Sequence, residues 1–144
     1  MNSIGEAEKL ARGAKTDERF WAKVDKRQDN ECWPWQGAKT AAGYGLFWPE
    51  RRTTVTAHRY MYELYYDEEV PVGIDVHHIC YNKTCVNPHH LQVMSKLENT
   101  RDAYKNKTHC AKGHEWIPEN FYYKSNGTKD CLKCRRDRSR NRRR

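Results

Sequence analysis

The sequence predicts an α+β protein made of small modules that are stapled by metal ions. Short β-branched and aromatic runs, separated by Gly, Pro and Asn, predict brief strands rather than one large sheet. Only 37% of the 144 residues are hydrophobic and 32% are charged, so the core is thin and needs additional staples. The six cysteines and several histidines supply such staples, because they form two groups with metal-ligand spacing.

The N-terminal segment, residues 1–31, is expected to be helical. Phe20, Trp21 and Val24 recur at i, i+1 and i+4, which predicts a short amphipathic helix from Thr16 or Asp17 to Val24. We expect this helix to cover the core of the domain that follows.

An antiparallel β-meander is predicted for residues 32–56. Its three strands are expected at 32–36, 44–48 and 52–56, where aromatic and β-branched residues alternate with polar ones. The alternating aromatic residues favour core packing, with a base-stacking platform as the alternative. A two-stranded ribbon fits the DNA major groove, so the polar face is a candidate DNA-binding surface. Its basic residues are Lys39, Arg51 and Arg52.

A helix is predicted from Ala57 to about Tyr66, with Thr56 as its N-cap. Its apolar face is formed by Ala57, Tyr60, Met61 and Leu64. His58 and Arg59 lie at its start, and their role stays open between packing and phosphate contact or support of an active site.

The segment from Val76 to Asn99 carries most of the chemistry. Residues 76–79 end a strand that follows a turn at Pro71 and Gly73, and residues 80–90 form a loop because Asn and Pro interrupt regular structure. Residues 91–94 alternate as a second strand. Ser95 and Glu98 form a capping box, which predicts a helix that begins at Ser95 and carries Asn99.

Two sets of four ligands each suit tetrahedral Zn²⁺. The first combines Cys32 with the loop residues Cys80, Cys85 and His90, where His90 is preferred over its neighbour on spacing; ordinary reduced thiols are the alternative. The second consists of Cys110, His114, Cys131 and Cys134, around a hairpin with Asn-Gly at its apex. Residues 109–134 are therefore expected to form a C-terminal zinc-ribbon-like module. Its four protein ligands leave no open position for water, so we expect it to bind DNA rather than to catalyse.

Positive charge is concentrated at the C-terminus. The net charge is +8, and residues 135–144 hold seven arginines against one aspartate. Such a basic tail is attracted to polyanions, and arginine favours bidentate phosphate contact. The candidate contacts are Arg135, Arg136, Arg138 and Arg140. A merely solubilising tail is the alternative.

The spacing of His78, Cys80, Cys85, His90 and Asn99 resembles the His-Cys box of homing endonucleases, a branch of the HNH nucleases that includes phage-like enzymes. The resemblance implies a ββα-metal nuclease domain over residues 32–108. It implies His78 as the general base and Asn99 as the ligand of a catalytic Mg²⁺ or Mn²⁺. His77 stands where many HNH enzymes place a second metal ligand.

These observations predict a DNA endonuclease that cuts phosphodiester bonds with one Mg²⁺ and His-activated water, leaving 5′-phosphate and 3′-hydroxyl ends. The alternative is a non-catalytic zinc-dependent DNA- or RNA-binding regulatory protein, which has no need for His78 and Asn99 at these offsets. The expected partner is double-stranded DNA, with a homodimer allowed and no small-molecule cofactor. A polar N-terminus and the lack of a long apolar run predict a location in the cytoplasm of a bacterium or phage-infected cell.

Overall fold

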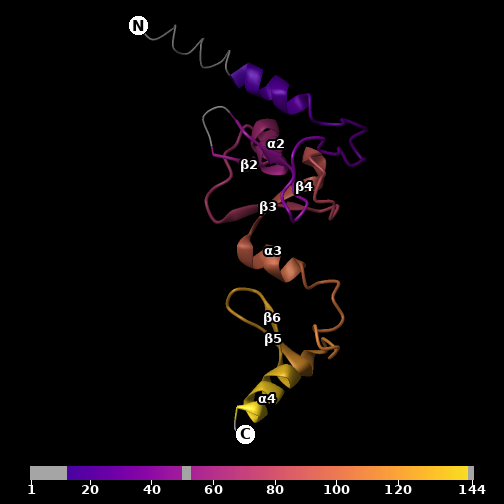
Figure 1. The fold of residues 1–144 in the computed structure, drawn as a ribbon, viewed down its shortest axis with the longest axis vertical. Helices are drawn as coiled ribbons and strands as arrows, with labels where there is room; N and C mark the ends of the chain where they lie inside the picture. Colours follow the sequence, from indigo (N-terminus) through magenta and orange to yellow (C-terminus); the bar gives the residue numbers. More distant parts are fainter. Residues whose placement is uncertain (1–12, 50–52, 143–144) are drawn as a thin grey trace. The chain divides into compact units, whose positions relative to one another are not determined.

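The computed structural model describes residues 13–49 and 53–142, and Figure 1 shows the order of the elements along the chain. The chain divides into two compact units. Unit 1 comprises the described parts of Met1–Pro71 together with Val76–Val93. Unit 2 comprises Val72–Asp75 and the described part of Met94–Arg144.

Unit 1 is built around aromatic side chains from its N-terminal half. Residues 13–21 are helical and place Phe20 in full burial, so the predicted helix is present but ends before Val24, which forms an isolated bridge with Trp35. The Phe20 ring lies 5.0 Å from the rings of both Trp35 and Phe47. Gly45 allows this packing, because a Cβ atom there would lie 2.6 Å from the Trp35 ring. Trp33, Trp35 and Phe47 are thus core residues, as the sequence favoured, whereas Trp48 is exposed.

The predicted meander is only partly present. Strand β1 (Leu46–Phe47) pairs antiparallel with β2 (Val55–Thr56), but both strands are two residues long. Residues 32–36 do not form the expected first strand. Instead, isolated bridges join Trp35 to Val24 and Pro34 to Cys85, because this stretch contacts segments distant in sequence. The expectation of a three-stranded meander is therefore corrected.

Helix α2 spans Ala57–Tyr66, as predicted. Thr56 occupies the N-cap position, although its side chain makes no capping hydrogen bond. The buried face includes Ala57 and Met61, together with His58. Asp67 ends the helix with a positive φ of 51°, so the chain turns sharply away from the helix axis.

A hairpin carries the central segment. Strand β3 (Ile74–His78) pairs with β4 (Leu91–Ser95), and the intervening loop ends in the 3₁₀ helix η1 (Pro88–His90). The loop and both strands follow the prediction closely. Side chains alternate along β3, so Val76 and His78 are buried while Asp75 and His77 are half-buried.

Unit 2 begins with helix α3 (Lys96–Asp102), and the predicted capping box of Ser95 and Glu98 is formed. After the 3₁₀ helix η2 (Pro118–Asn120), strands β5 (Phe121–Tyr123) and β6 (Lys129–Cys131) pair antiparallel. Helix α4 (Leu132–Asn141) follows directly. Residues 135–141, expected as part of a basic tail, thus continue a helix that starts at Leu132, within the segment predicted to form a zinc-ribbon-like module. No helix of the described residues is long and apolar enough to cross a membrane.

Candidate functional site

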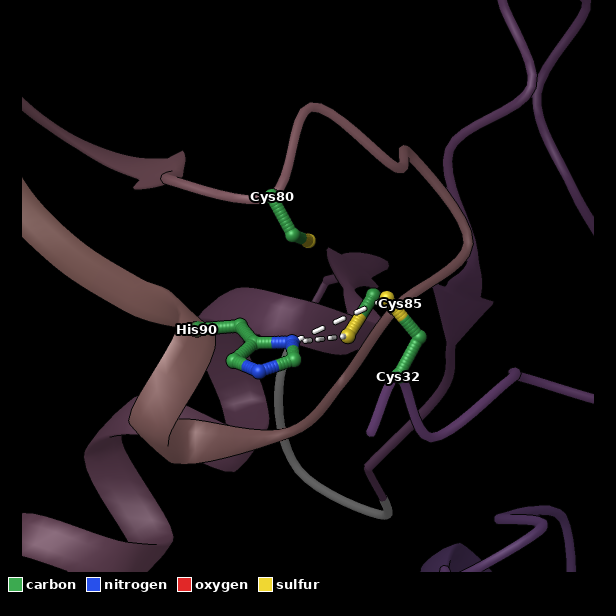
Figure 2. Close-up of side chains that lie close together, drawn as sticks. All are labelled: Cys32, Cys80, Cys85 and His90. Carbon is green, nitrogen blue, oxygen red and sulfur yellow. Dashed lines mark hydrogen bonds between the residues drawn. The ribbon is translucent and has the colours of Figure 1, made fainter. Parts of the chain in front are cut away.

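The first predicted set of zinc ligands is assembled in unit 1. Ligand atoms of Cys32, Cys80, Cys85 and His90 all lie within 4.8 Å of one another, and Figure 2 shows the four side chains converging. His90 Nδ1 lies 3.7 Å from the Sγ atoms of both Cys32 and Cys85. Zinc bonds of about 2.3 Å to sulfur and 2.0–2.1 Å to nitrogen place tetrahedral ligands roughly 3.5–3.8 Å apart. The donor set and its spacing therefore fit Zn²⁺.

Asn87 holds the ligand loop in place and was not identified from the sequence. It is fully buried, and its Nδ2 donates to the backbone carbonyls of Asp29 and Glu31 at 2.8 and 2.6 Å. Its Oδ1 accepts from the backbone N–H of His89 and so caps η1. The Asn-Pro pair predicts a break in regular structure, and Asn before a Pro-initiated helical turn is also a capping signal.

The second predicted set is assembled in unit 2. Ligand atoms of Cys110, His114, Cys131 and Cys134 lie within 4.8 Å of one another. Cys110 Sγ lies 3.6 Å from His114 Nδ1 and 3.7 Å from Cys134 Sγ. His114 Nδ1 lies 3.2 and 3.5 Å from the Sγ atoms of Cys134 and Cys131. These separations are again close to those of tetrahedral zinc ligands.

Asn120 plays in unit 2 the part that Asn87 plays in unit 1. It is buried, and its Nδ2 donates to the Glu115 carbonyl at 2.7 Å while its Oδ1 accepts from the Lys133 backbone N–H. Asn120 thereby joins the segment that follows His114 to the start of α4. The hairpin turn contains Gly127 with φ +83°, a conformation that favours glycine.

His78 is buried at the end of β3, with 5% of its surface exposed. Its Nε2 lies 2.9 Å from the Cys85 carbonyl oxygen. Because a carbonyl only accepts, Nε2 must donate, and in the neutral ring Nδ1 is then the basic nitrogen. Burial lowers the pKa of His78 below 6.5, an effect that the Cys85 hydrogen bond opposes and nearby His77 reinforces. A neutral imidazole with a defined tautomer is suited to take up a proton.

Two further rings pack around His78. The His58 ring lies 4.4 Å from the His78 ring, and the Tyr44 ring lies 6.1 Å from His78 in a stacked arrangement. Burial, followed by the neighbouring His78, lowers the pKa of His58 to about 3. His58 is therefore a neutral packing neighbour of His78, whereas Arg59 pairs with Glu63. Tyr44 was expected only as a strand residue.

Asn99 lies on α3 in unit 2 and is half-buried. Its side-chain Nδ2 donates to Oδ2 of Asp75 at 3.0 Å. Asp75 carried no signal in the sequence that singled it out. His77, the other predicted ligand of a catalytic cation, is half-buried and packs edge-on against the Tyr81 ring at 5.7 Å.

The predicted DNA contacts fall in both units. Lys39 is exposed and forms an isolated backbone bridge with Gly45, whereas Arg51 and Arg52 lie outside the described residues. On α4, one pocket is lined by Leu132, Arg135, Arg136, Ser139 and Arg140. Arg138 differs from the other arginines, because it donates to Asp130 at 3.1 Å and so helps to hold α4 against β6.

Comparison with known proteins gives a family match over the segment that contains the central hairpin. Residues 55–101 match the family model described as HNH endonuclease. Protein 2.8 of Escherichia phage T7 is 37% identical over 89 residues, a match that covers 61% of this chain and 59% of the relative. Protein 7.7 of the same phage is 40% identical over 85 residues, covering 59% of this chain and 63% of the relative. No solved structure matches the chain.

The matched family segment runs from β2 to α3, so it contains His78, the first cluster's loop ligands and Asn99. The two relatives are both phage proteins. The resemblance noted in the sequence is thereby confirmed at this level: residues 55–101 carry the pattern of the HNH endonucleases, and the chain has phage relatives.

Proposed function

We propose that this chain is a metal-dependent DNA endonuclease of the HNH type, which hydrolyses phosphodiester bonds to leave 5′-phosphate and 3′-hydroxyl ends. The observation that carries the proposal is the hydrogen bond of His78, whose buried imidazole donates from Nε2 to the Cys85 carbonyl. This hydrogen bond fixes the ring and leaves Nδ1 as the base. The segment that matches the HNH endonuclease family, residues 55–101, contains this histidine.

The proposed role of His78 is to remove a proton from the water that attacks the phosphorus. A general base of this kind works best with a pKa near or below the operating pH, where it is neutral. The burial that lowers the pKa of His78 favours that state. His58 and Tyr44, which pack against the ring, limit its rotation and so keep the basic nitrogen in one direction.

Asn99, with His77, is proposed to hold a divalent cation. The donor set fits such an ion, since a carboxamide oxygen is a hard ligand and Mg²⁺ accepts few protein ligands beside water and phosphate. When bound, the cation offsets negative charge on the phosphate and on the departing 3′ oxygen. The two Cys₃His clusters are proposed to hold structural Zn²⁺, the first fixing the loop whose Cys85 carbonyl orients His78.

Contact with the DNA backbone is proposed for Lys39, Arg51 and Arg52 and for the arginines of α4. Arg135, Arg136 and Arg140 line the same pocket, which suits phosphate groups. The expected affinity falls with salt by roughly 0.9 log units per log unit of salt for each phosphate contacted. Arg138 is expected to contribute less to binding, because Asp130 already pairs with it.

The test is DNA cleavage by the zinc-loaded full chain with and without added Mg²⁺ or Mn²⁺. His78→Ala is expected to abolish cleavage while DNA affinity and zinc content stay near those of the wild type. His89→Ala is the matched control, since His89 is exposed, adjacent to a zinc ligand and outside both clusters. It is expected to cut normally. Equal cleavage by His78→Ala and wild type would remove His78 from the mechanism.

The alternative is a zinc-dependent DNA- or RNA-binding regulatory protein without catalysis, which both Cys₃His clusters and the basic α4 also support. Omitting Mg²⁺ separates the two functions better than a chelator, because a chelator also removes structural zinc. Binding without cleavage at any Mg²⁺ or Mn²⁺ concentration would favour the regulator. If cleavage occurs, mapping both strands of the product shows whether one site nicks or two protomers cut together, since a palindromic target implies two-fold symmetry.

A further inference from the structure

The partner of Asn99 on strand β3 is a carboxylate. Asn99 Nδ2 lies 3.0 Å from Asp75 Oδ2, and both side chains are half-buried in unit 2. The two residues are 24 positions apart in sequence. The hydrogen bond therefore links helix α3 to the strand that also carries His77 and His78.

The chemistry of this contact fixes which way the carboxamide faces. An ionised carboxylate accepts hydrogen bonds and donates none, so the NH₂ group of Asn99 must be the part directed at Asp75. The carboxamide oxygen is attached to the same carbon and is consequently turned away from the carboxylate. That oxygen is the atom of an asparagine that binds a hard cation. An asparagine without such a partner interconverts freely between two amide orientations.

The surrounding backbone keeps both partners in place. The reciprocal hydrogen bonds of Ser95 and Glu98 fix the first turn of α3, and Asn99 follows immediately. Asp75 is held by the regular pairing of β3 with β4. Asn has a low helix propensity, because its side chain competes for backbone hydrogen bonds, so a bond to Asp75 offsets a cost at this position. Asp75 belongs to neither Cys₃His cluster.

We propose that Asp75 is a positioning residue, which holds the Asn99 carboxamide with its oxygen turned toward the divalent cation. The inference rests on the proposed nuclease function. It assigns Asp75 no contact with the cation itself. The role of the carboxylate is to accept a hydrogen bond, so an uncharged acceptor of the same size replaces it.

The test compares Asp75→Ala with Asp75→Asn in the zinc-loaded full chain. Binding of Mn²⁺ is measured by electron paramagnetic resonance, and cleavage is measured over a range of Mn²⁺ concentrations. Asp75→Ala is expected to weaken Mn²⁺ binding by about 10- to 100-fold, as is typical for the loss of a residue that orients a metal ligand. Asp75→Asn is expected to stay within about 3-fold of the wild type, because its amide oxygen still accepts from Asn99.

Two controls separate positioning from other effects. Glu119→Ala removes an exposed acidic group of unit 2 and is expected to change neither Mn²⁺ binding nor cleavage. In the Asn99→Ala background, adding Asp75→Ala is expected to have no further effect, because Asp75 acts through Asn99. An additive loss in the double variant would contradict the proposal. Equal impairment of Asp75→Asn and Asp75→Ala would also contradict it and assign the negative charge itself the important role.

The hydrogen bond can be followed without any cleavage assay. In ¹⁵N-resolved spectra, the side-chain NH₂ of Asn99, assigned by its loss in Asn99→Ala, is expected to exchange with water faster in Asp75→Ala than in wild type or Asp75→Asn. Unchanged exchange would overturn the proposal. If the wild-type protein cuts no DNA with either cation, the proposed function fails, whereas the exchange measurement still reports on the Asp75–Asn99 contact.

Discussion

The two Cys₃His clusters use the same ligand types but draw them from different lengths of chain. In unit 1, Cys32 lies 58 residues from His90, so the cluster closes a long loop that contains α2 and the hairpin strand β3. In unit 2, Cys110 and Cys134 are only 24 residues apart. Closing the longer loop costs more chain entropy, but only modestly more, because this cost grows with the logarithm of loop length.

The two units differ more in their buried hydrophobic side chains than in the length of the loop that each cluster closes. Among the described residues, the buried hydrophobic side chains of unit 1 include Phe20, Trp35, Phe47 and Met61, whereas Cys131 is the single one in unit 2. Unit 1 thus has an aromatic core beside its cluster, and unit 2 has its cluster in place of a core. The same ligand set therefore lies beside an aromatic core in one unit and takes the place of a core in the other.

Metal removal should produce the largest difference between the units. Structural zinc contributes about 10–16 kcal/mol in small zinc modules, which exceeds what a unit with one buried hydrophobic side chain can replace. Chelation is therefore expected to unfold residues 110–141, while the Phe20–Trp35–Phe47 core retains part of its structure. Residue-resolved NMR spectra before and after chelation measure this. Simultaneous loss of all signals would show that the core depends equally on zinc.

A substitution in the aromatic core should destabilise unit 1 and leave unit 2 unchanged, the reverse of metal removal. Trp35→Ala removes a ring that is 1% exposed and packs against Phe20, and it is expected to cost about 3–5 kcal/mol in unit 1. The second cluster should bind zinc unchanged. Denaturant unfolding followed separately by signals of each unit tests the expectation. A matched loss in unit 2 would mean that the units are not independent in stability.

The two buried asparagines allow a finer comparison. Asn87→Ala leaves the carbonyls of Asp29 and Glu31 and the His89 N–H without their partner, whereas Asn120→Ala leaves the Glu115 carbonyl and the Lys133 N–H. These hydrogen bonds are partly buried, and each one lost costs about 0.5–1.5 kcal/mol, so Asn87→Ala is expected to destabilise its unit more. Zinc affinity measured by competition with a chelator should fall in the same order. Leu91 provides no such bonds, so Leu91→Val serves as a mild packing control.

The smallest expected effect is a pH dependence of the stability of unit 1, which arises from His58. The pKa of His58 is about 3 in the folded chain and near 6.5 when exposed, so below pH 6.5 the unfolded chain binds the proton first. Stability should therefore fall as the pH is lowered from 6.5 toward 3, by roughly 1–2 kcal/mol between pH 7 and 5. His58→Gln is expected to show a shallower pH dependence of unfolding. Parallel curves for the two proteins would rule out His58 as the source.

Local patterns predicted much of this molecule. The capping box at Ser95, helix α2 and the central hairpin follow from residues within a few positions of one another, and local interactions set these elements. The ligand sets were also predictable, because three ligands of the first set lie within residues 80–90 and the second set consists of two pairs at recognised spacings.

What sequence reasoning missed depends on distant contacts. The stretch at 32–36 alternates like a strand, yet its partners are Val24 and Cys85 rather than a neighbouring strand. Burial of His58 against His78 arises from the packing of α2 on the hairpin strand, which no local pattern specifies. Asp75 is one acidic residue among many until its hydrogen bond to Asn99 is seen.

The second cluster is compact in sequence, so evolution can add or remove it as one segment. Its four ligands, hairpin, buried asparagine and arginine-bearing helix all fall within residues 110–141. A single insertion or deletion of that stretch can therefore add or remove the complete cluster together with its helix. The first cluster offers no such shortcut, since transferring it requires everything from Cys32 to His90 and with it the histidine at the end of β3.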